Sequence, residues 1–327
     1  ILRGADLTNA NLTGVDLTGI DLTGAKLSGL DLSDKDLTGT ILRGADLTNA
    51  NLTGVDLTDK DLTGTILRGS DLTNANLTGI DLSGRDLTGV KLSGLALSDK
   101  DLTGTMLREV DLTNVNLTGV DLSGRDLTGV KLSGLDLSDK DLTGTMLREV
   151  DLSDKDLTGA KLSGLDLSDK DLTGAKLSGL DLSDKDLTGT ILYRTDFTDT
   201  ILPNDYLSGK NFESTLFIRV DLSGKDLSYS DFTYANFADA NLENANLSHA
   251  VFVSTDLTKI KNKSLAGADL SGASFAHSNL SGVDLTGVTL GATNFWNTDL
   301  SGHGSTIIYD INTFLYHLNN AVQKLFN

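Results

Sequence analysis

The sequence predicts an all-β solenoid, and three observations lead to this fold class. Leucine or phenylalanine occupies every fifth position without a break from Leu2 to Leu257. Neither regular period fits this spacing, because five residues turn an α-helix by about 500° and leave no stripe, and on a strand they alternate between faces. Near-identical runs begin at Ile1 and at Ile41. Apolar residues spaced in this way share one interior only if the chain turns once per unit, as in stacked repeats.

The units follow the pattern Ala-Asp/Asn-Leu-x-x, as in Ala5-Asp6-Leu7 and Ala245-Asn246-Leu247. This pattern resembles the pentapeptide-repeat proteins over residues 1–302. The resemblance implies a right-handed, quadrilateral parallel β-helix of four units per coil, in which the central Leu and the residue two before it point inward. That gives about 15 coils. Spacings of 20 residues support the coil independently in three phenylalanine series: Phe197, Phe217 and Phe237; Phe212, Phe232 and Phe252; Phe275 and Phe295.

The pattern divides the chain into a repeat region, 1–302, and a tail, 303–327. Three extra residues interrupt the repeat register within 258–264. Glycines after Thr or Ser suit corners with positive φ. The Asp or Asn before each central residue suits a bond to nearby backbone. Because the sequence opens in mid-repeat, we expect further coils or another domain to precede Ile1.

Eleven units carry Lys or Arg at the inward position where the family pattern favours small residues. Since an unpaired buried cation is costly, we expect each stem to line the wall and each charged group to reach the flanking carboxylates. A charged channel is the alternative interpretation. The residues are Lys35, Lys60, Arg85, Lys100, Arg125, Lys140, Lys155, Lys170, Lys185, Lys210 and Lys225.

Two groups of outward residues are candidate partner-binding sites. The first repeats every 40 residues, so that apolar side chains beside arginines share one outer face: Ile66, Arg68, Met106, Arg108, Met146 and Arg148. The second begins where aromatic residues first appear and includes the lysines of the register slip: Tyr193, Tyr206, Tyr229, Tyr234, Lys259, Lys261 and Lys263. Apolar residues flanked by Arg suit protein interfaces, and loops on rigid scaffolds often carry function. Duplicated neutral surface and a tolerated insertion are the alternatives.

The tail has helical spacing, with Asp310 placed as an N-cap. We expect it to cover the open edge of the last coil or, as the resemblance to quinolone-resistance members implies, to form a homodimer. The two roles are compatible. Its apolar residues include Ile311, Phe314, Leu315, Leu318, Val322, Leu325 and Phe326.

Composition excludes several classes of site. The 327 residues contain no Cys, and the net charge of −19 argues against direct binding to nucleic acid or anionic membranes. No apolar run is long enough to span a membrane. The four His have no metal-ligand spacing, and aspartates recur because the repeat requires them, so they do not indicate acid–base catalysis. We therefore expect no catalytic, metal or cofactor site. The absence of a visible signal peptide and of Cys favours a cytoplasmic location, and secretion stays open as the alternative because the sequence opens in mid-repeat.

These observations favour a non-enzymatic scaffold for protein–protein interaction, as one module of a larger protein. The alternative is an acidic DNA mimic that binds a type II topoisomerase such as gyrase, as in quinolone-resistance members of the family. Mixed charge in the first 192 residues and the long, almost uninterrupted array weaken that alternative. Ice binding through outward Thr is a third hypothesis, weakened because Thr and Ser occur on all faces.

Overall fold

The structure, a computed structural model, describes residues 2–33 and 35–303. The chain forms a β-helix solenoid whose coils are joined by isolated parallel β-bridges rather than by long strands. Bridges connect residues 20 positions apart, for example Asp6 with Lys26, Lys26 with Asp46 and Asp46 with Ile66. The 20-residue coil expected from the phenylalanine spacing is therefore confirmed. The tail residues expected to form a cap or dimer helix lie outside the described residues.

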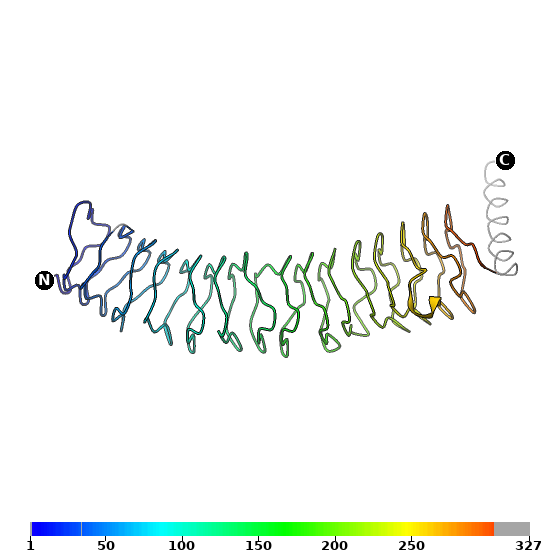
Figure 1. The fold of residues 1–327 in the computed structure, drawn as a ribbon, viewed down its shortest axis with the longest axis horizontal. Coiled ribbons are helices and arrows are strands. Elements are labelled where there is room, and N and C mark those ends of the chain that lie inside the picture. Colours follow the sequence, from blue (N-terminus) through cyan, green and yellow to red (C-terminus); the bar gives the residue numbers. More distant parts are fainter. Residues whose placement is uncertain (1, 34, 304–327) are drawn as a thin grey trace. The chain divides into compact units, whose positions relative to one another are not determined.

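The chain divides into two compact units. One contains Ile1–Asp151 and Ala160–Asp166, and the other contains Leu152–Gly159 and Leu167–Asn327. In each unit successive coils lie side by side along the chain (Figure 1). In the described part, the only helix is η1, a 3-10 turn over Lys261–Lys263.

The central residues of the units form the core of each coil. The phenylalanines stack as their spacing predicts: Phe212 lies 5.3 Å from Phe232 with an interplanar angle of 6°, and Phe232 lies 4.9 Å from Phe252. The series continues across the register slip, since Phe252 and Phe275 stack at 4.9 Å. Rings of the neighbouring series, such as Phe237, meet this column edge to face. Stacking thus buries each ring between coils.

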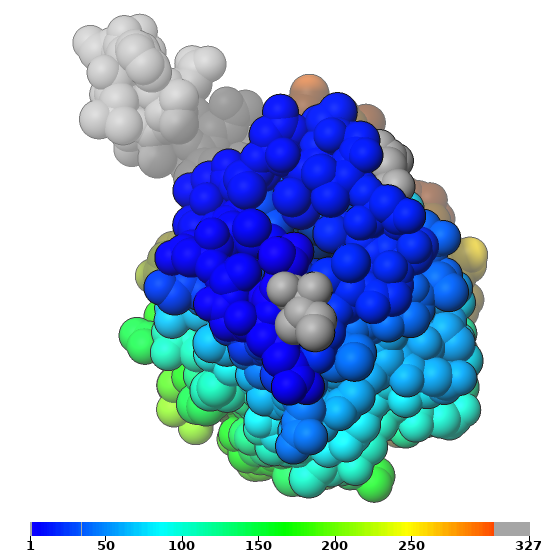
Figure 2. All heavy atoms as spheres, turned by 90° about the vertical axis from the view of Figure 1, so that its left-hand side faces the viewer, coloured from blue at the N-terminus to red at the C-terminus, as the bar shows by residue number. Residues whose placement is uncertain are grey.

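Burial depends on having a coil on both sides. The first coil, at the dark-blue end that faces the viewer in Figure 2, has a neighbour on one side only. Leu7 and Leu12 in the first coil are half-exposed, whereas Leu27 and Leu47 one and two coils further are fully buried. This difference is the nearest-neighbour behaviour expected of stacked repeats.

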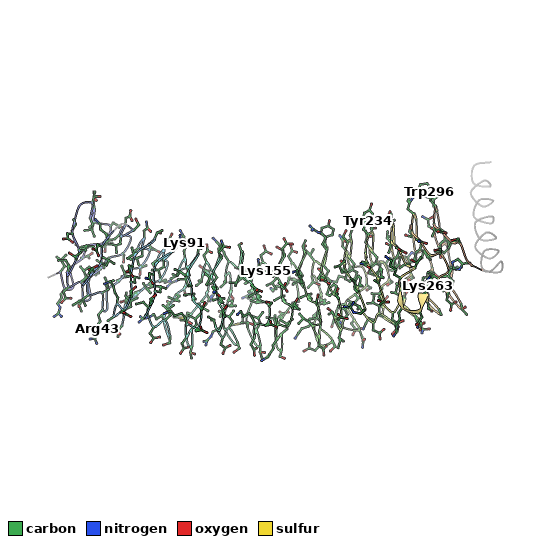
Figure 3. All side chains as sticks on the ribbon, viewed as in Figure 1. Arg43, Lys91, Lys155, Tyr234, Lys263 and Trp296 are labelled. Carbon is green, nitrogen blue, oxygen red and sulfur yellow. The ribbon has the colours of Figure 1, made fainter. Side chains whose placement is uncertain are left out.

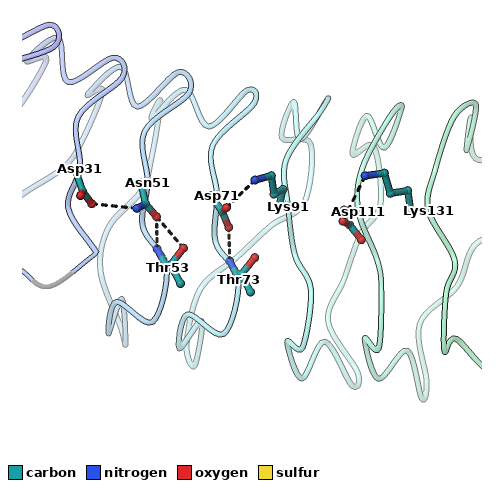
Figure 4. Close-up of polar contacts among 8 residues, drawn as sticks. All are labelled: Asp31, Asn51, Thr53, Asp71, Thr73, Lys91, Asp111 and Lys131. Carbon is teal, nitrogen blue, oxygen red and sulfur yellow. Dashed lines mark hydrogen bonds and ion pairs between the residues drawn. The ribbon is translucent and has the colours of Figure 1, made fainter.

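A short hydrogen-bond motif recurs at the corners where Asp or Asn precedes the central residue. The Asp or Asn before the central residue accepts from the residue two positions after it: the Thr53 N–H and hydroxyl both donate to Asn51 Oδ1, at 3.1 and 2.7 Å, and the Thr73 N–H donates to Asp71 Oδ1 at 3.0 Å (Figure 4). The predicted role of Asp and Asn in bonding nearby backbone is confirmed. This local bond is an Asx turn, which needs only a short side-chain acceptor.

Positive backbone φ at the corner explains the recurring glycine. Gly54 and Gly79 have φ of +70° and +74°, in the left-handed region that L side chains avoid. Asn and Asp take the same conformation elsewhere, as at Asn49 and Asp59 with φ of 57° and 52°. They tolerate this region better than other residues, so corner glycines alternate with Asn and Asp.

Outward residues at the bridged positions pair between coils. In one column of the first unit, Asn51 donates to Asp31 at 3.0 Å, Lys91 Nζ lies 2.9 Å from Asp71 and Lys131 Nζ lies 3.8 Å from Asp111 (Figure 4). The hydrogen bond to Asp71 raises the pKa of Lys91. Such exposed pairs stabilise weakly, by about 0–1 kcal/mol each, but they keep like charges from facing one another.

The expectation for the inward basic residues is wrong for seven of the eleven, which donate to main-chain carbonyls of the preceding coil rather than to flanking carboxylates. Lys60 Nζ donates to Leu37 O at 2.6 Å and Lys100 Nζ to Leu77 O at 2.9 Å. Lys185, in contrast, reaches the flanking carboxylate of Asp184 at 3.2 Å. The seven are Lys35, Lys60, Arg85, Lys100, Lys140, Lys210 and Lys225.

The reason lies in the turn geometry. Leu37 O accepts the N–H of Thr40 within its own turn and keeps a second lone pair facing the next coil. Each inward side chain lies over the carbonyl of the central residue 23 positions before it. Lys60 lies over Leu37 O in this way, and Thr65 donates to Leu42 O at 2.9 Å. The flanking Asp61 is held by the Thr63 N–H at 2.8 Å. The ammonium of Lys60 therefore donates to the carbonyl of the preceding coil. Any inward side chain with a hydrogen-bond donor at a suitable distance can make the same bond.

Candidate interaction surface

Within residues 2–33 and 35–303, no group of three or more His, Cys, Asp or Glu is arranged to hold a metal ion. In the same part of the chain, no helix has the length and apolar character needed to cross a membrane. The candidates from the sequence are exposed outward residues, and their positions are described below.

The apolar residues spaced by 40 lie in one outer column of the first unit. Ile66, Met106 and Met146 are 48%, 51% and 51% exposed. Each is bridged to an aspartate of the preceding coil, for example Met106 to Asp86 and Met146 to Asp126. The aspartates alternate with the apolar side chains, so the column is not a continuous apolar surface.

The flanking arginines accompany those aspartates. Arg108 Nε lies 3.7 Å from Asp126 Oδ2. Hydrogen bonds from Thr128, together with the charges of Arg108 and Arg148, lower the pKa of Asp126. The charge of Arg68 likewise lowers the pKa of Asp86, although the hydrogen bond from the Thr88 hydroxyl is the largest cause. The arginines therefore already have partners within the coil stack.

An irregular corner at Pro203 borders a hollow of about 340 Å³ in the second unit. Lys225 Nζ donates there to Leu202 O, Pro203 O and Asn204 Oδ1, at 3.1, 3.2 and 2.9 Å. Burial lowers the pKa of Lys225. Because this ammonium occupies three oxygens of the corner, it takes the position that a bound cation would need.

The tyrosines of the second group of candidates also lie in the second unit. Tyr193 is half-buried and Tyr206 is 49% exposed. Tyr229 and Tyr234 are 65% and 61% exposed and stand at successive corners, with φ of 60° at each. Trp296 is 67% exposed.

Two histidines, His249 and His277, join these aromatic side chains. His249 stacks on Tyr229 with ring centroids 4.7 Å apart and planes at 9°. His277 meets Trp296 edge to face at 4.5 Å, and its Nδ1 lies 2.9 Å from Asn297 Nδ2. The signal was present in the 20-residue spacing from Tyr229 to His249, since residues at this interval lie on adjacent coils.

The structure does not bring the three lysines of the register slip together with the aromatic corners. Lys259 O accepts from the Asp239 N–H, and the Lys261 N–H donates to Ala240 O, so this segment stacks on a different part of the coil. Figure 3 shows Tyr234 and Trp296 along one edge of the second unit and Lys263 away from that edge. The second group therefore comprises two separate surfaces.

Comparison with known proteins identifies the repeat. The family model described as Pentapeptide repeats matches residues 1–84 in overlapping segments and then 86–124, 126–164, 166–204, 226–261 and 264–302. No curated protein matches the chain.

Solved structures of the same repeat are similar to the chain at low identity. QnrB1, a plasmid-mediated fluoroquinolone resistance protein, is 16% identical, with 83% of this chain and 91% of that chain covered and a TM-score of 0.29. HetL, involved in heterocyst differentiation regulation in the cyanobacterium Nostoc sp. strain PCC 7120, is 22% identical, with 90% and 94% covered and a TM-score of 0.15. Rfr23 from the cyanobacterium Cyanothece 51142 is 23% identical, with 43% and 86% covered and a TM-score of 0.17.

These likenesses carry no argument about partners. The family rests on the match of the repeat model to most of the sequence, in agreement with the 20-residue bridges and the inward leucines. The chain belongs to the pentapeptide-repeat family.

Proposed function

We propose that this chain is a non-enzymatic scaffold for protein–protein interaction, built on a right-handed, four-sided coil repeated about 15 times. The observation that carries this proposal is the exposure of Tyr229, Tyr234 and Trp296, which are the most exposed large hydrophobic side chains in residues 2–33 and 35–303. Exposed tyrosine and tryptophan are the residues most enriched at protein interfaces.

The remaining parts of the proposal concern assembly and excluded partners. The tail residues 303–327 cap the last coil, form a homodimer, or do both. The partner is a protein rather than nucleic acid or membrane, since a net charge of −19 repels phosphate.

The test is a quantitative pull-down with the full chain as bait, followed by reconstitution with each captured protein after purification. Replacing Tyr229 by Gly and Tyr234 by Asn puts common corner residues of the array at these positions. We expect this variant to lose at least 90% of one captured partner, while Ile66→Asp leaves capture unchanged. Retention of every partner by a variant changed throughout the outward positions of residues 193–264 would place the interaction elsewhere and contradict the proposal.

An acidic DNA mimic directed at a type II topoisomerase is the second candidate function, and one observation favours it. A column of the first unit presents an aspartate in five successive coils: Asp61, Asp81, Asp101, Asp121 and Asp141. Neighbours in the column repel, since Asp81 acts to raise the pKa of Asp101 and Asp141 acts to raise that of Asp121, although hydrogen bonds from Thr103 and Ser123 leave both values lowered. A line of carboxylates resembles a phosphate backbone in charge. In a DNA gyrase supercoiling assay this function predicts inhibition at micromolar protein, and unchanged supercoiling would exclude it.

A further inference from the structure

One half of four successive coils in the second unit combines the exposed aromatic residues with negative charge. We call it the aromatic face and define it as residues 226–236, 246–256, 269–279 and 289–299. Bridges place these segments in register, joining Asp226 to Asn246, Asn246 to Asp269 and Asp269 to Thr289. The face contains five aspartates and no lysine or arginine: Asp226, Asp231, Asp256, Asp269 and Asp299.

The other half of the same coils carries both positive and negative charges. Its segments 237–245, 257–268 and 280–288 hold the three lysines of the register slip and three acidic residues, Asp239, Glu243 and Asp284, and therefore have no net charge. Lys263 and Tyr234 accordingly lie at different edges in Figure 3. Net negative charge therefore lies on the aromatic face and not on the other half, although the repeat pattern does not determine the charge of outward residues.

The corners of the aromatic face carry side chains that the fold does not require. Tyr229, Tyr234, His249 and His277 all have φ of 59–60°, a conformation that large side chains adopt only with strain. Most units of the array have Gly, Asn or Asp at this corner, as at Gly54 and Asn49, and a few have other side chains such as Glu109 and Arg194. Because the two tyrosines are more than 60% exposed, their burial contributes little free energy to offset the backbone strain. A strained, exposed aromatic residue points to a ligand contact.

We propose that the aromatic face binds a lysine- or arginine-rich segment of a protein partner, whose cationic side chains stack on Tyr229, Tyr234 and Trp296 between the aspartates. This inference rests on the proposed function and names the chemistry of its partner. Cations are attracted to the faces of aromatic rings, and each exposed contact of this kind is expected to change affinity about two- to fivefold. The surrounding carboxylates steer the basic segment to the face and make its binding sensitive to salt.

The experiment measures fluorescence anisotropy of a labelled peptide, six repeats of Arg-Gly, titrated with the full chain. A peptide with Gln in place of Arg is the neutral control. We expect the Arg peptide to bind, the Gln peptide to bind at least tenfold more weakly, and affinity for the Arg peptide to fall severalfold when NaCl is raised from 50 to 300 mM. No measurable binding of the Arg peptide would overturn the proposal.

Two sets of variants separate the aromatic contribution from net charge. Tyr229→Gly, Tyr234→Asn and Trp296→Thr together introduce residue types found at the same positions of other units, and we expect about a tenfold loss of affinity. Asp226→Asn with Asp256→Asn keeps the acceptors of the Asx turns and should weaken binding and its salt dependence. Circular dichroism should show both proteins as stable as the parent, and unchanged affinity in both would overturn the proposal.

A matched control removes charge from the opposite half. The variant with Lys259→Gln, Lys261→Gln and Lys263→Gln makes the chain more acidic. If net negative charge alone held the Arg peptide, this variant would bind it more tightly, by a factor as large as the loss of affinity caused by the aromatic changes. We expect a change below twofold. Binding of cellohexaose to the aromatic face, without binding of the Arg peptide, would replace the proposal by a carbohydrate site. If a partner captured in the pull-down depends on residues 193–264 but not on the three aromatic residues, this inference fails while the proposed function stands.

Discussion

At the scale of single residues, two short-range bonds and one backbone conformation explain the five-residue unit. The Asp or Asn accepts from the residue directly after the central Leu, as Asn51 does from Thr53. The carbonyl of that Leu accepts the N–H three residues on, as Leu52 O does from Val55. Between them stands a corner with positive φ, such as Gly54 at +70°. Each bond satisfies a backbone group that would otherwise be unpaired. This is why the unit contains so few residue types.

The corner conformation leads to a prediction for two glycines. Gly54→Ala adds a Cβ where no atom lies within 4 Å, so its loss of stability reports the left-handed conformation alone, about 1 kcal/mol. Gly79→Ala has the same conformation, but its Cβ would collide with the Asp59 carboxylate and lie 3.3 Å from Asp59 Cα.

Urea unfolding followed by circular dichroism should therefore show a larger loss for Gly79→Ala than for Gly54→Ala. Gly79→Asn is a second comparison, since Asn accepts the conformation while keeping the contact between coils. Equal losses in the two alanine variants would show that crowding between coils is unimportant.

At the scale of elements, the coil accepts an insertion without loss of register. Bridges change from a 20-residue to a 23-residue offset at Asn246 and Asp269 and return to 20 between Ser264 and Asp284. Within this coil Ile260 fills the inward position at 3% exposure, and η1 projects after it. The two ends of η1 remain in the hydrogen-bonded stack, since the Lys261 N–H donates to Ala240 O and Lys263 O accepts from the Asp284 N–H. The extra length is therefore accommodated as an exposed turn between two bonded positions.

Deleting Lys261–Lys263 should restore the five-residue spacing between Leu257 and Leu265. We expect the variant to fold with an unchanged circular dichroism spectrum and a Tm within a few degrees of the parent, because Ser264 then directly follows the inward Ile260. The Ser264 N–H and Ile260 O then take the places of the Lys261 N–H and Lys263 O, which bond to the neighbouring coils. Shorter surface loops lose little closure entropy. Emission from Trp296, the only tryptophan, gives a local measure of unfolding in these coils. A loss of cooperative unfolding would mean that η1 is a structural part of the coil.

At the scale of the whole molecule, aspartates whose pKa is lowered recur in both units. The main cause is the repeat itself, since the Thr or Ser two residues later donates to the carboxylate, as Thr18 does to Asp16 and Thr286 to Asp284. In Asp141 the hydrogen bonds from Thr143 and from Lys161 lower the pKa from 3.8 to about 2. A lowered pKa contributes stability above pH 3.8 that is lost as pH falls through about 2.

The Tm should therefore be nearly constant from neutral pH to about pH 5 and fall steeply between about pH 4 and pH 2. Asp141→Asn keeps an acceptor for the Thr143 N–H but removes the ion pair with Lys161 at 3.0 Å. We expect it to lower the Tm slightly at pH 7 and not at pH 2.

The control is Asp16→Asn, since the charge that acts on Asp16 is the like charge of Asp36. It should not lower the Tm at pH 7. A Tm independent of pH down to 2 would show that these carboxylates bind protons equally in the folded and unfolded chain.

The sequence by itself determined the solenoid, the 20-residue coil and the inward leucines. Their cause is local, since one unit makes its own turn bonds and its spacing permits one interior. The stacking of Phe232 on Phe252 also followed from spacing alone.

Only the tertiary structure decided where the polar groups between coils find partners. Lys60 has acidic neighbours in sequence, yet its ammonium meets Leu37 O from the coil before it. The spacing shows which residues lie in register on adjacent coils, but not which backbone carbonyl can still accept a second hydrogen bond. The pairing of His249 with Tyr229, and the separation of Lys259 from both, likewise depend on which residues meet between coils. The candidate surface is therefore a property of the stack, whereas the coil is a property of the repeat.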